Sequence, residues 1–483
     1  MPGQAALGLR QAFREAFRTK SGIAGSFMLA VLLGMVIIIP FVAPYDVVST
    51  WGDRSEWIDN PRLAAPAWTE WFAGRDLPET MIFEPSDFRK VRVPSSQFNL
   101  TFVVLRKTFT YAADEFPSEL TLWAWASFAT NSTPNLNVTW IRPDGETVTL
   151  LDRGLEIRAP TPNEYPFSQT GTTKNTAQAI RNWALGHNAT ETAPANKPDP
   201  WTYVKPEVTL FAVAGEDMLD FRRAKVLKGE YTLRLDYLGF STTEDLDAKF
   251  IVYGTIFGLA GTDDARRDLF IGFLWGAPVA LAFGTVAALV IVLIQTILGA
   301  ISGWYGGWID EIVQRFSDGL LIIPLLPILI IIALFYDPGI VVILLVLVAF
   351  GFVGSTTKVI RSLVLQIREE QYIEAAQSYG ASRARILFRY IMPRVMPYTF
   401  ALIALSVPSY IFLEASLSFL GLGDPVLPTW GAVIGDAYSD GALYYGYWWW
   451  IAVPTAGILF TTVAFALLGY AFDKVLNPRL REE

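Results

Sequence analysis

Two residue types are almost missing from this chain of 483 residues, which has no cysteine and a single histidine, His187. Without cysteine the chain has no disulfide, no thiolate nucleophile and no cysteine-ligated metal. One histidine excludes most catalytic triads and zinc sites, because these pair an imidazole with a second group. We therefore expect no catalytic residue, no metal site and no cofactor in this chain.

A phosphate-binding loop is also missing. No lysine directly follows a glycine, so the pattern G-x-x-x-x-G-K cannot be matched. We expect that the chain is not an enzyme and that any nucleotide hydrolysis on which the protein depends comes from another subunit. The net charge of −8 and the lack of one concentrated basic patch argue against a nucleic-acid partner.

Apolar residues are abundant instead, since 52% of the chain is hydrophobic and its mean hydropathy is +0.35. Such a chain is too apolar for an ordinary soluble protein and too mixed to be wholly embedded in lipid. About twenty apolar residues cross the roughly 30 Å hydrocarbon layer of a membrane. Six stretches are predicted to span it: 23–43, 277–303, 320–335, 339–352, 395–412 and 448–472.

Two predicted spans carry residues that are unusual inside a membrane. Pro324 and Pro327 predict a kink in the third span, which serves either a transport pathway or only helix packing. Glu414, near the end of the fifth span, is costly in hydrocarbon unless it faces water or a partner. It either lines an outer gate or accepts hydrogen bonds at the helix end, and the sequence leaves both open.

Lysine and arginine gather at span ends that share one side of the membrane if there are six spans. These residues are Arg10, Arg14, Arg18, Lys20, Arg361, Arg368, Arg383, Arg385, Arg389, Arg394, Lys474, Arg479 and Arg481. We expect a multi-pass plasma-membrane protein with both termini in the cytoplasm. The predicted parts are an amphipathic helix over 1–22, a first span over 23–45, an extracytoplasmic insert over 46–260, helices two to six over 261–472 with a cytoplasmic loop over 361–394, and a cytoplasmic tail over 473–483.

The insert over 46–260 has a different composition, being polar and rich in Pro, Asn and Thr. Alternating runs at 98–111, 118–128, 137–152 and 229–239 predict strands, and 137–152 contains a Pro-Asp-Gly turn. We expect a mainly-β, sandwich-like domain with one short helix at 176–186. Asn99, Asn131, Asn137 and Asn188 begin Asn-x-Ser/Thr sequons, which are compatible with glycosylation on an outer surface.

The segment 374–393, EAAQSYGASRARILFRYIMP, lies in the basic loop. Its pattern predicts two short helices joined at Gly380, with Ser382 capping the second. Small side chains at 375 and 376 would let a partner approach closely, while Ile386, Leu387 and Tyr390 would pack toward the membrane helices. We interpret the segment as a knob that contacts another subunit; an interfacial loop without a partner is the alternative.

This segment resembles the EAA coupling motif of ABC importer permeases. The chain around it resembles the second, C-type permease of the dipeptide and oligopeptide transport family, to which related oligosaccharide permeases belong. Further matches are PFVAPYD after the first span, GTDDARRDLFIGFLWGAPVALAFG into the second, EASLSFLGLGDPVLPTWGAVI after the fifth and the terminal DKVLNPRLR. They cover almost everything except the insert between helices one and two.

The resemblance implies a type I ABC importer permease fold with six transmembrane helices. It implies a second homologous permease, two ATPase subunits that bind ATP and Mg²⁺, and an extracytoplasmic substrate-binding protein as partners, besides membrane lipid. The residues that would contact the ATPase are Glu374, Ala375, Ala376, Gly380, Ala381, Ser382, Arg383 and Pro393. Glu414, Pro324 and Pro327 remain candidates for the pathway or gate.

Two departures qualify the resemblance. The family has a glycine in GTDxxGRD where this chain has Arg266, and its loop before that motif is usually short. The insert is expected either to dock the binding protein or to contact a bulky substrate, on which Trp123, Trp125, Trp140 and Trp201 would stack. The expected cargo is an oligopeptide or an oligosaccharide, and the sequence does not distinguish these from another substrate. An ion-driven secondary transporter and a membrane-anchored adhesion or sensor protein are the alternatives.

Overall fold

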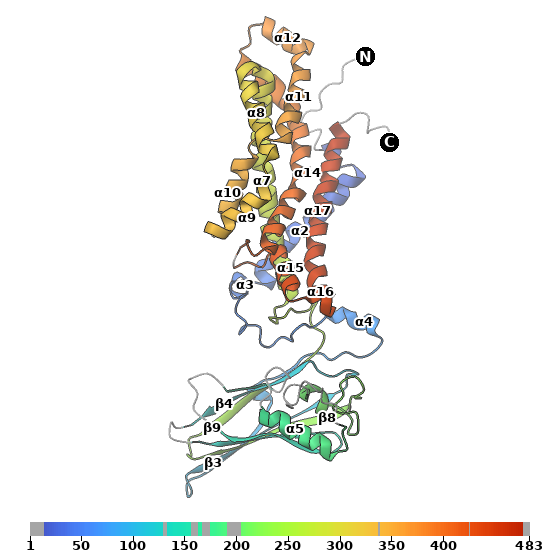
Figure 1. Cartoon of the computed structure of the whole chain (residues 1–483), viewed down its shortest axis with the longest axis vertical. Helices are drawn as coiled ribbons and strands as arrows, with labels where there is room; N and C mark the ends of the chain where they lie inside the picture. The colour runs from blue at the N-terminus through green and yellow to red at the C-terminus, as the bar shows by residue number, and fades with distance from the viewer. Residues whose placement is uncertain are drawn as a thin grey trace. The chain divides into compact units, whose positions relative to one another are not determined.

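The chain divides into two compact units in a computed structural model (Figure 1). A helical unit comprises residues 1–52 and 269–483, and a β unit comprises residues 53–268. The structure describes residues 14–128, 133–155, 163–166, 174–190, 204–336, 339–424 and 426–476. The amphipathic helix predicted over 1–22 lies largely outside the described residues, as do Trp201, Asn131 and the end of the C-terminal tail.

The helical unit combines long apolar helices with several short ones. Its elements are α2 (Lys20–Val42), α3 (Tyr45–Ser49), α7 (Leu269–Tyr305), α8 (Gly307–Ile322), α9 (Leu325–Tyr336), α10 (Ile340–Gly351), α11 (Ser355–Arg368), α12 (Gln371–Ser378), α13 (Arg383–Ile386), a π-helical turn (Leu387–Ile391), α14 (Met392–Phe419), α15 (Trp430–Ser439), α16 (Ala442–Tyr445) and α17 (Trp448–Leu476). Helix α7 packs on α11 and α14, and α17 packs on α2 and α14.

Four helices among the described residues are long and apolar enough to cross a membrane: α2, α7, α17 and the continuous stretch Arg383–Phe419. Two further helix pairs pass the same test together but are bent, α8 with α9 by 71° and α10 with α11 by 42°. The number rises to six if each bent pair forms one span, so the six-span count stays a prediction. The predicted kink is present, because Pro324 lies at the break between α8 and α9.

Glycines allow the closest helix contacts of this unit. A Cβ on Gly299 would lie 2.5 Å from the Thr357 carbonyl oxygen, and one on Gly303 would lie 2.9 Å from that of Arg361, so both seat α11 directly on α7. Trp430 is 1% exposed and fills a space between α7 and α17. Cβ atoms on Gly276 and Gly457 would come within 2.2 and 2.6 Å of its ring, so only glycine fits at either position.

The β unit is a pair of antiparallel sheets (Figure 1). One sheet has the order β1-β9-β4-β7 and the other β2-β3-β8-β5-β6. The strands are β1 (Met81–Phe83), β2 (Arg89–Ser95), β3 (Leu100–Tyr111), β4 (Glu119–Ser127), β5 (Asn135–Ile141), β6 (Thr147–Gly154), β7 (Asn163–Pro166), β8 (Gly229–Gly239) and β9 (Asp245–Tyr253); the helices are α4 (Glu70–Ala73), α5 (Lys174–Gly186) and α6 (Pro206–Thr209).

Side chains from both sheets form one apolar core. Tyr231, Leu233, Leu235 and Tyr237 alternate along β8 and are at most 1% exposed, which confirms the face predicted for this strand. The predicted Pro-Asp-Gly turn joins β5 to β6, where Gly145 takes a positive φ of 86°. Trp140 is fully buried in this core. The suggestion that it stacks on a sugar is therefore wrong, because a ligand has no access to its ring.

Arg266 occupies the position where the family pattern has glycine. Its φ is +67°, the left-handed conformation that glycine adopts without strain. The turn is therefore retained despite the substitution. The guanidinium donates a 2.7 Å hydrogen bond to the Asn60 carbonyl oxygen, pairs with Glu119 and lies 4.2 Å from the centre of the Tyr253 ring.

Candidate coupling site

The basic loop forms a compact helix–turn–helix between α11 and α14. Helix α12 ends at Ser378, and Gly380 reverses the chain with a φ of 77°. The Gly380 and Ala381 amides donate to the carbonyls of Gln377 and Ala376, at 2.9 and 3.1 Å, which closes the helix end. The Ser382 hydroxyl then accepts a 3.3 Å hydrogen bond from the Arg385 amide and caps α13.

One side of this segment is packed into the chain. Ile373, Ile386, Leu387 and Ile391 are at most 2% exposed and share a cluster with Ala300, Trp304, Ile360 and Val364 of α7 and α11. The Trp304 indole also donates a 3.0 Å hydrogen bond to the Arg383 carbonyl oxygen. These contacts attach the segment to two membrane helices at once.

The other side is exposed. Glu374, Ala375, Ser382, Arg383, Ala384, Arg385 and Pro393 are exposed, and Ala381 is half-buried. Tyr379 is 92% exposed at the turn beside Gly380. We name the exposed part of α12 and α13, from Glu374 to Arg385, the knob face. Sequence reasoning missed Tyr379, although an aromatic residue next to a turn glycine in a polar loop is a recognisable signal.

Two expectations about this segment are wrong. Ala376 is 7% exposed and belongs to the buried cluster, so its methyl group packs inside the chain and is not on the knob face. Tyr390 is 37% exposed and does not share the burial of Ile386 and Leu387. The π-helical turn over Leu387–Ile391 changes the helical phase there, so that Ile391 takes the buried position.

Ion pairs connect the neighbouring helices. Arg361 of α11 binds the Asp310 carboxylate of α8 through Nε at 2.6 Å and through a terminal nitrogen at 2.5 Å, and the Ser302 hydroxyl donates to the same carboxylate at 2.5 Å. Asp318 pairs with Lys358. Arg394 stacks 4.6 Å from the Tyr372 ring, and burial raises the pKa of that phenol. These interactions connect α8 to α11 and the start of α14 to α12, next to the knob face.

The candidates for a pathway or gate occupy different places. Glu414 is 3% exposed and accepts a 2.7 Å hydrogen bond from the Ser418 hydroxyl one turn later in α14. This geometry fits the acceptor alternative, since one carboxylate oxygen accepts a hydrogen bond inside the chain. Pro324 and Pro327 are exposed on the surface of this single chain at the bend between α8 and α9.

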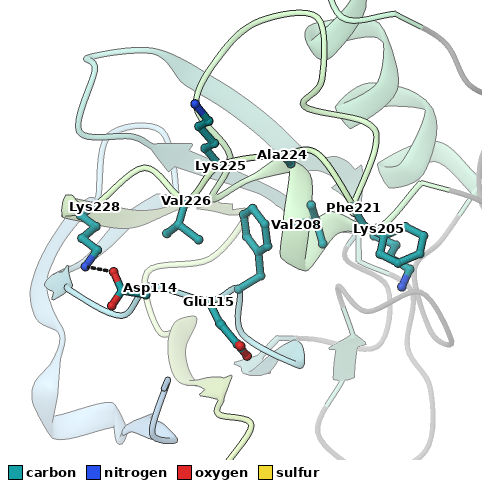
Figure 2. Close-up of a pocket in the computed structure, with 10 residues that line it drawn as sticks. Asp114, Glu115, Lys205, Val208, Phe221, Ala224, Lys225, Val226 and Lys228 are labelled. Carbon is teal, nitrogen blue, oxygen red and sulfur yellow. Dashed lines mark hydrogen bonds and ion pairs between the residues drawn. The ribbon is translucent and has the colours of Figure 1, made fainter. Parts of the chain in front are cut away.

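The β unit has a cavity of its own, of about 590 Å³ (Figure 2). It is lined by Asp114, Glu115, Phe116, Lys205, Val208, Phe221, Ala224, Lys225, Val226 and Lys228. Figure 2 shows Lys228 paired with Asp114, at 2.6 Å, and the Lys205 ammonium lies 4.2 Å from the Phe221 ring centre. The lining is therefore mixed in charge, and it brings together none of the predicted site residues.

These features define the chain as a polytopic helical membrane protein that carries a separate β unit. The sequence profile of the family described as "Binding-protein-dependent transport system inner membrane component" matches residues 295–482, which include the knob face. The chain belongs to this family, as a C-type peptide permease of ABC importers. Family membership sets aside the secondary-transporter and adhesion alternatives.

Curated relatives support the assignment. The chain is 36% identical to the oligopeptide transport system permease protein OppC of Bacillus subtilis over 223 residues, which are 46% of this chain and 72% of the relative. It is 35% identical to the dipeptide transport system permease protein DppC of Bacillus subtilis, over 46% of this chain and 68% of the relative. It is 33% identical to the glutathione transport system permease protein GsiD of Pectobacterium atrosepticum, over 46% and 72%.

Proposed function

We propose that this permease forms the translocation pathway of an ABC importer together with a second homologous permease. Two ATPase subunits bind ATP and Mg²⁺ and contact the knob face, and a substrate-binding protein delivers the cargo. The cargo is an oligopeptide, because the relatives are named for oligopeptide, dipeptide and glutathione transport. An oligosaccharide is the second candidate, and the burial of Trp140 removes one of the aromatic rings that favoured it.

The observation that carries this proposal is the two-sided construction of the segment 371–391. Its buried side belongs to one cluster with α7 and α11, while its exposed side presents Glu374, Ala375 and Tyr379. A partner that displaces the knob face therefore pushes on both helices. ATP-driven closure of the ATPases would shift the helices toward an outward-open arrangement, which is a population shift between two states of the permease.

The same proposal includes a topology. Six spans, with each bent pair crossing once, place both termini and the loop 361–394 in the cytoplasm and the β unit outside the cell. Arginine and lysine near the proposed cytoplasmic ends support this direction. The parts predicted over 1–22, 23–45, 46–260, 261–472 and 473–483 follow from it.

Gly380→Leu tests the coupling role in the reconstituted complex. Leucine is strained at a φ of 77°, by roughly 1–2 kcal/mol, so the turn and the knob face shift. We expect ATP hydrolysis to continue while substrate uptake per ATP falls several-fold. Gly446→Leu is the matched control, because Gly446 also has a positive φ, of 86°, and open space around its Cβ position. Equal uptake per ATP in both variants would refute the assignment.

Contact with the ATPase is measured separately. Because the chain has no cysteine, Ala375→Cys introduces a single thiol on the knob face. We expect it to crosslink to an ATPase subunit through a short bifunctional reagent. A thiol placed at the exposed Phe98 of the β unit serves as the control and should give no such product.

A further inference from the structure

The β unit carries a small exposed apolar surface at one end. Trp71 and Phe72 of α4 are 82% and 80% exposed, and Leu259 of a neighbouring loop is 64% exposed. We call these three side chains the aromatic tip. Exposed apolar side chains that lie together, unlike single ones, mark contact sites for proteins or membranes, and no part of the peptide permease function accounts for these three.

Hydrogen bonds hold the two loops of the tip together. The Ala67 amide donates to the Gly258 carbonyl oxygen at 2.9 Å, and the Trp68 indole donates to that of Leu259 at 3.0 Å. The Trp68 and Phe72 rings meet edge to face, with centres 6.3 Å apart. Trp71 and Phe72 are therefore presented on an ordered support, which lowers the entropic cost of binding through them.

We propose that the aromatic tip inserts into the headgroup region of the lipid membrane. Leu259 precedes Leu269, the first residue of the apolar helix α7, by ten residues. A chain of that length reaches at most about 35 Å, so the connection allows the tip to reach the membrane surface. Tryptophan and other amphipathic aromatic side chains favour this interfacial layer. Which leaflet is contacted depends on the topology in the proposed function.

A protein partner fits this surface less well. A stable protein interface buries about 800 Å² on each side and needs a complementary rim of polar contacts. The tip offers only three apolar side chains. The nearby cation Arg75 is already paired with Glu115 at 2.5 Å within the β unit, so it does not supply a polar contact for the rim of a protein interface. Insertion into lipid needs no matching surface, so few aromatic side chains suffice.

Site-directed spin labelling of the full chain measures the depth of the tip. Trp71→Cys and Phe72→Cys each supply one labelling site in a chain without native cysteine. Phe98→Cys is the matched control, because Phe98 is an aromatic residue, 68% exposed, in the turn between β2 and β3. Phe98 lies at the end of the sandwich opposite the tip. The side chain of its neighbour Asn99 donates a hydrogen bond to the Phe240 carbonyl oxygen, which lies just before the first residue of β9, whereas Leu259 of the tip comes after the last residue of β9.

The labelled chains are placed in vesicles of phosphatidylcholine and phosphatidylglycerol without any binding protein. Oxygen concentrates in lipid and a nickel chelate in water, so we expect a several-fold higher ratio of oxygen to nickel collisions at 71 and 72 than at 98. Equal ratios at the three positions would overturn the proposal. Shielding from both reagents, or shielding that appears only after a binding protein is added, would also overturn it and indicate a protein contact.

This outcome is separable from that of the proposed topology. An impermeant maleimide added outside the vesicles reports the side of the membrane on which residue 98 lies, and ATP-driven uptake reports transport. A shallow tip with normal uptake would reject lipid insertion alone. A lipid-inserted tip with residue 98 on the ATPase side would reject the topology alone.

Discussion

Replacement of Arg266 by glycine and by alanine separates two opposing effects at one residue. The left-handed backbone costs a non-glycine residue roughly 1 kcal/mol, which glycine removes and alanine retains. Both variants lose the ion pair with Glu119, the hydrogen bond to Asn60 and the contact with the Tyr253 ring. The arginine side chain therefore stabilises a turn that its own backbone strains.

The magnitudes follow from the burial of these groups. The Arg266 and Glu119 side chains are 18% and 15% exposed, so loss of one partner leaves a poorly solvated charge and costs about 2–3 kcal/mol. The hydrogen bond adds about 1 kcal/mol and the ring contact about 0.5 kcal/mol. After relief of strain, Arg266→Gly should lower the local opening free energy by about 3 kcal/mol and Arg266→Ala by about 4 kcal/mol.

Hydrogen exchange of the full chain, followed by mass spectrometry, measures this opening. Amides of the neighbouring segments 56–64, 118–123 and 262–268 should exchange faster by about two orders of magnitude in Arg266→Gly and about three in Arg266→Ala. Arg234→Ala is the control, because the Arg234 side chain is 49% exposed and its pair with Asp236 contributes little. Equal exchange rates in the glycine and alanine variants would contradict the proposed backbone strain. Exchange rates unchanged from the original chain in both variants would contradict the stabilising role of the Arg266 side-chain contacts.

Two further predictions concern carboxylates that are partly or fully shielded from water. Burial raises the pKa of Glu207 to about 7, so the folded β unit binds an extra proton between pH 4.5 and 7. The free energy of unfolding of the β unit therefore falls by up to about 3 kcal/mol as the pH rises through this range. Glu207→Gln should flatten this pH dependence in thermal unfolding, whereas an unchanged slope would assign the dependence to another group. Asp310→Asn should lower the melting temperature of the chain in detergent because Arg361 loses its carboxylate partner. The double variant Asp310→Asn with Arg361→Gln should recover part of the lost melting temperature, and a double variant as unstable as the single one would contradict that cause.

Local patterns predicted the elements whose burial repeats regularly. Alternation along 229–239 predicted β8 and its buried face, and the Pro-Asp-Gly turn predicted the β5–β6 connection.

The lengths of α8 and α11 were not predictable in this way. Hydropathy suggested spans that start at 320 and end at 352, whereas the helices extend from Gly307 and to Arg368. Their polar turns are stabilised by pairs such as Asp310–Arg361, which join residues 51 positions apart.

At the candidate coupling site, the sequence predicted the turn and the cap but not the direction of every side chain. Gly380 and Ser382 have the roles expected of those residue types. Ala376 and Tyr390 differ because burial there depends on where α7 and α11 lie and on the π-helical turn.

Under the proposed function, a change at Trp304 separates binding of the ATPase from transmission of its movement. This residue is 7% exposed, packs behind the knob face and donates to the Arg383 carbonyl oxygen. Trp304→Ala leaves every side chain of the knob face in place but removes about 3–5 kcal/mol of packing beneath it. We expect the crosslink from residue 375 to persist while uptake per ATP falls, because the contact survives and the support does not. Loss of the crosslink would show instead that the buried cluster shapes the knob face itself, and unchanged uptake per ATP would show that movement reaches the membrane helices by another route.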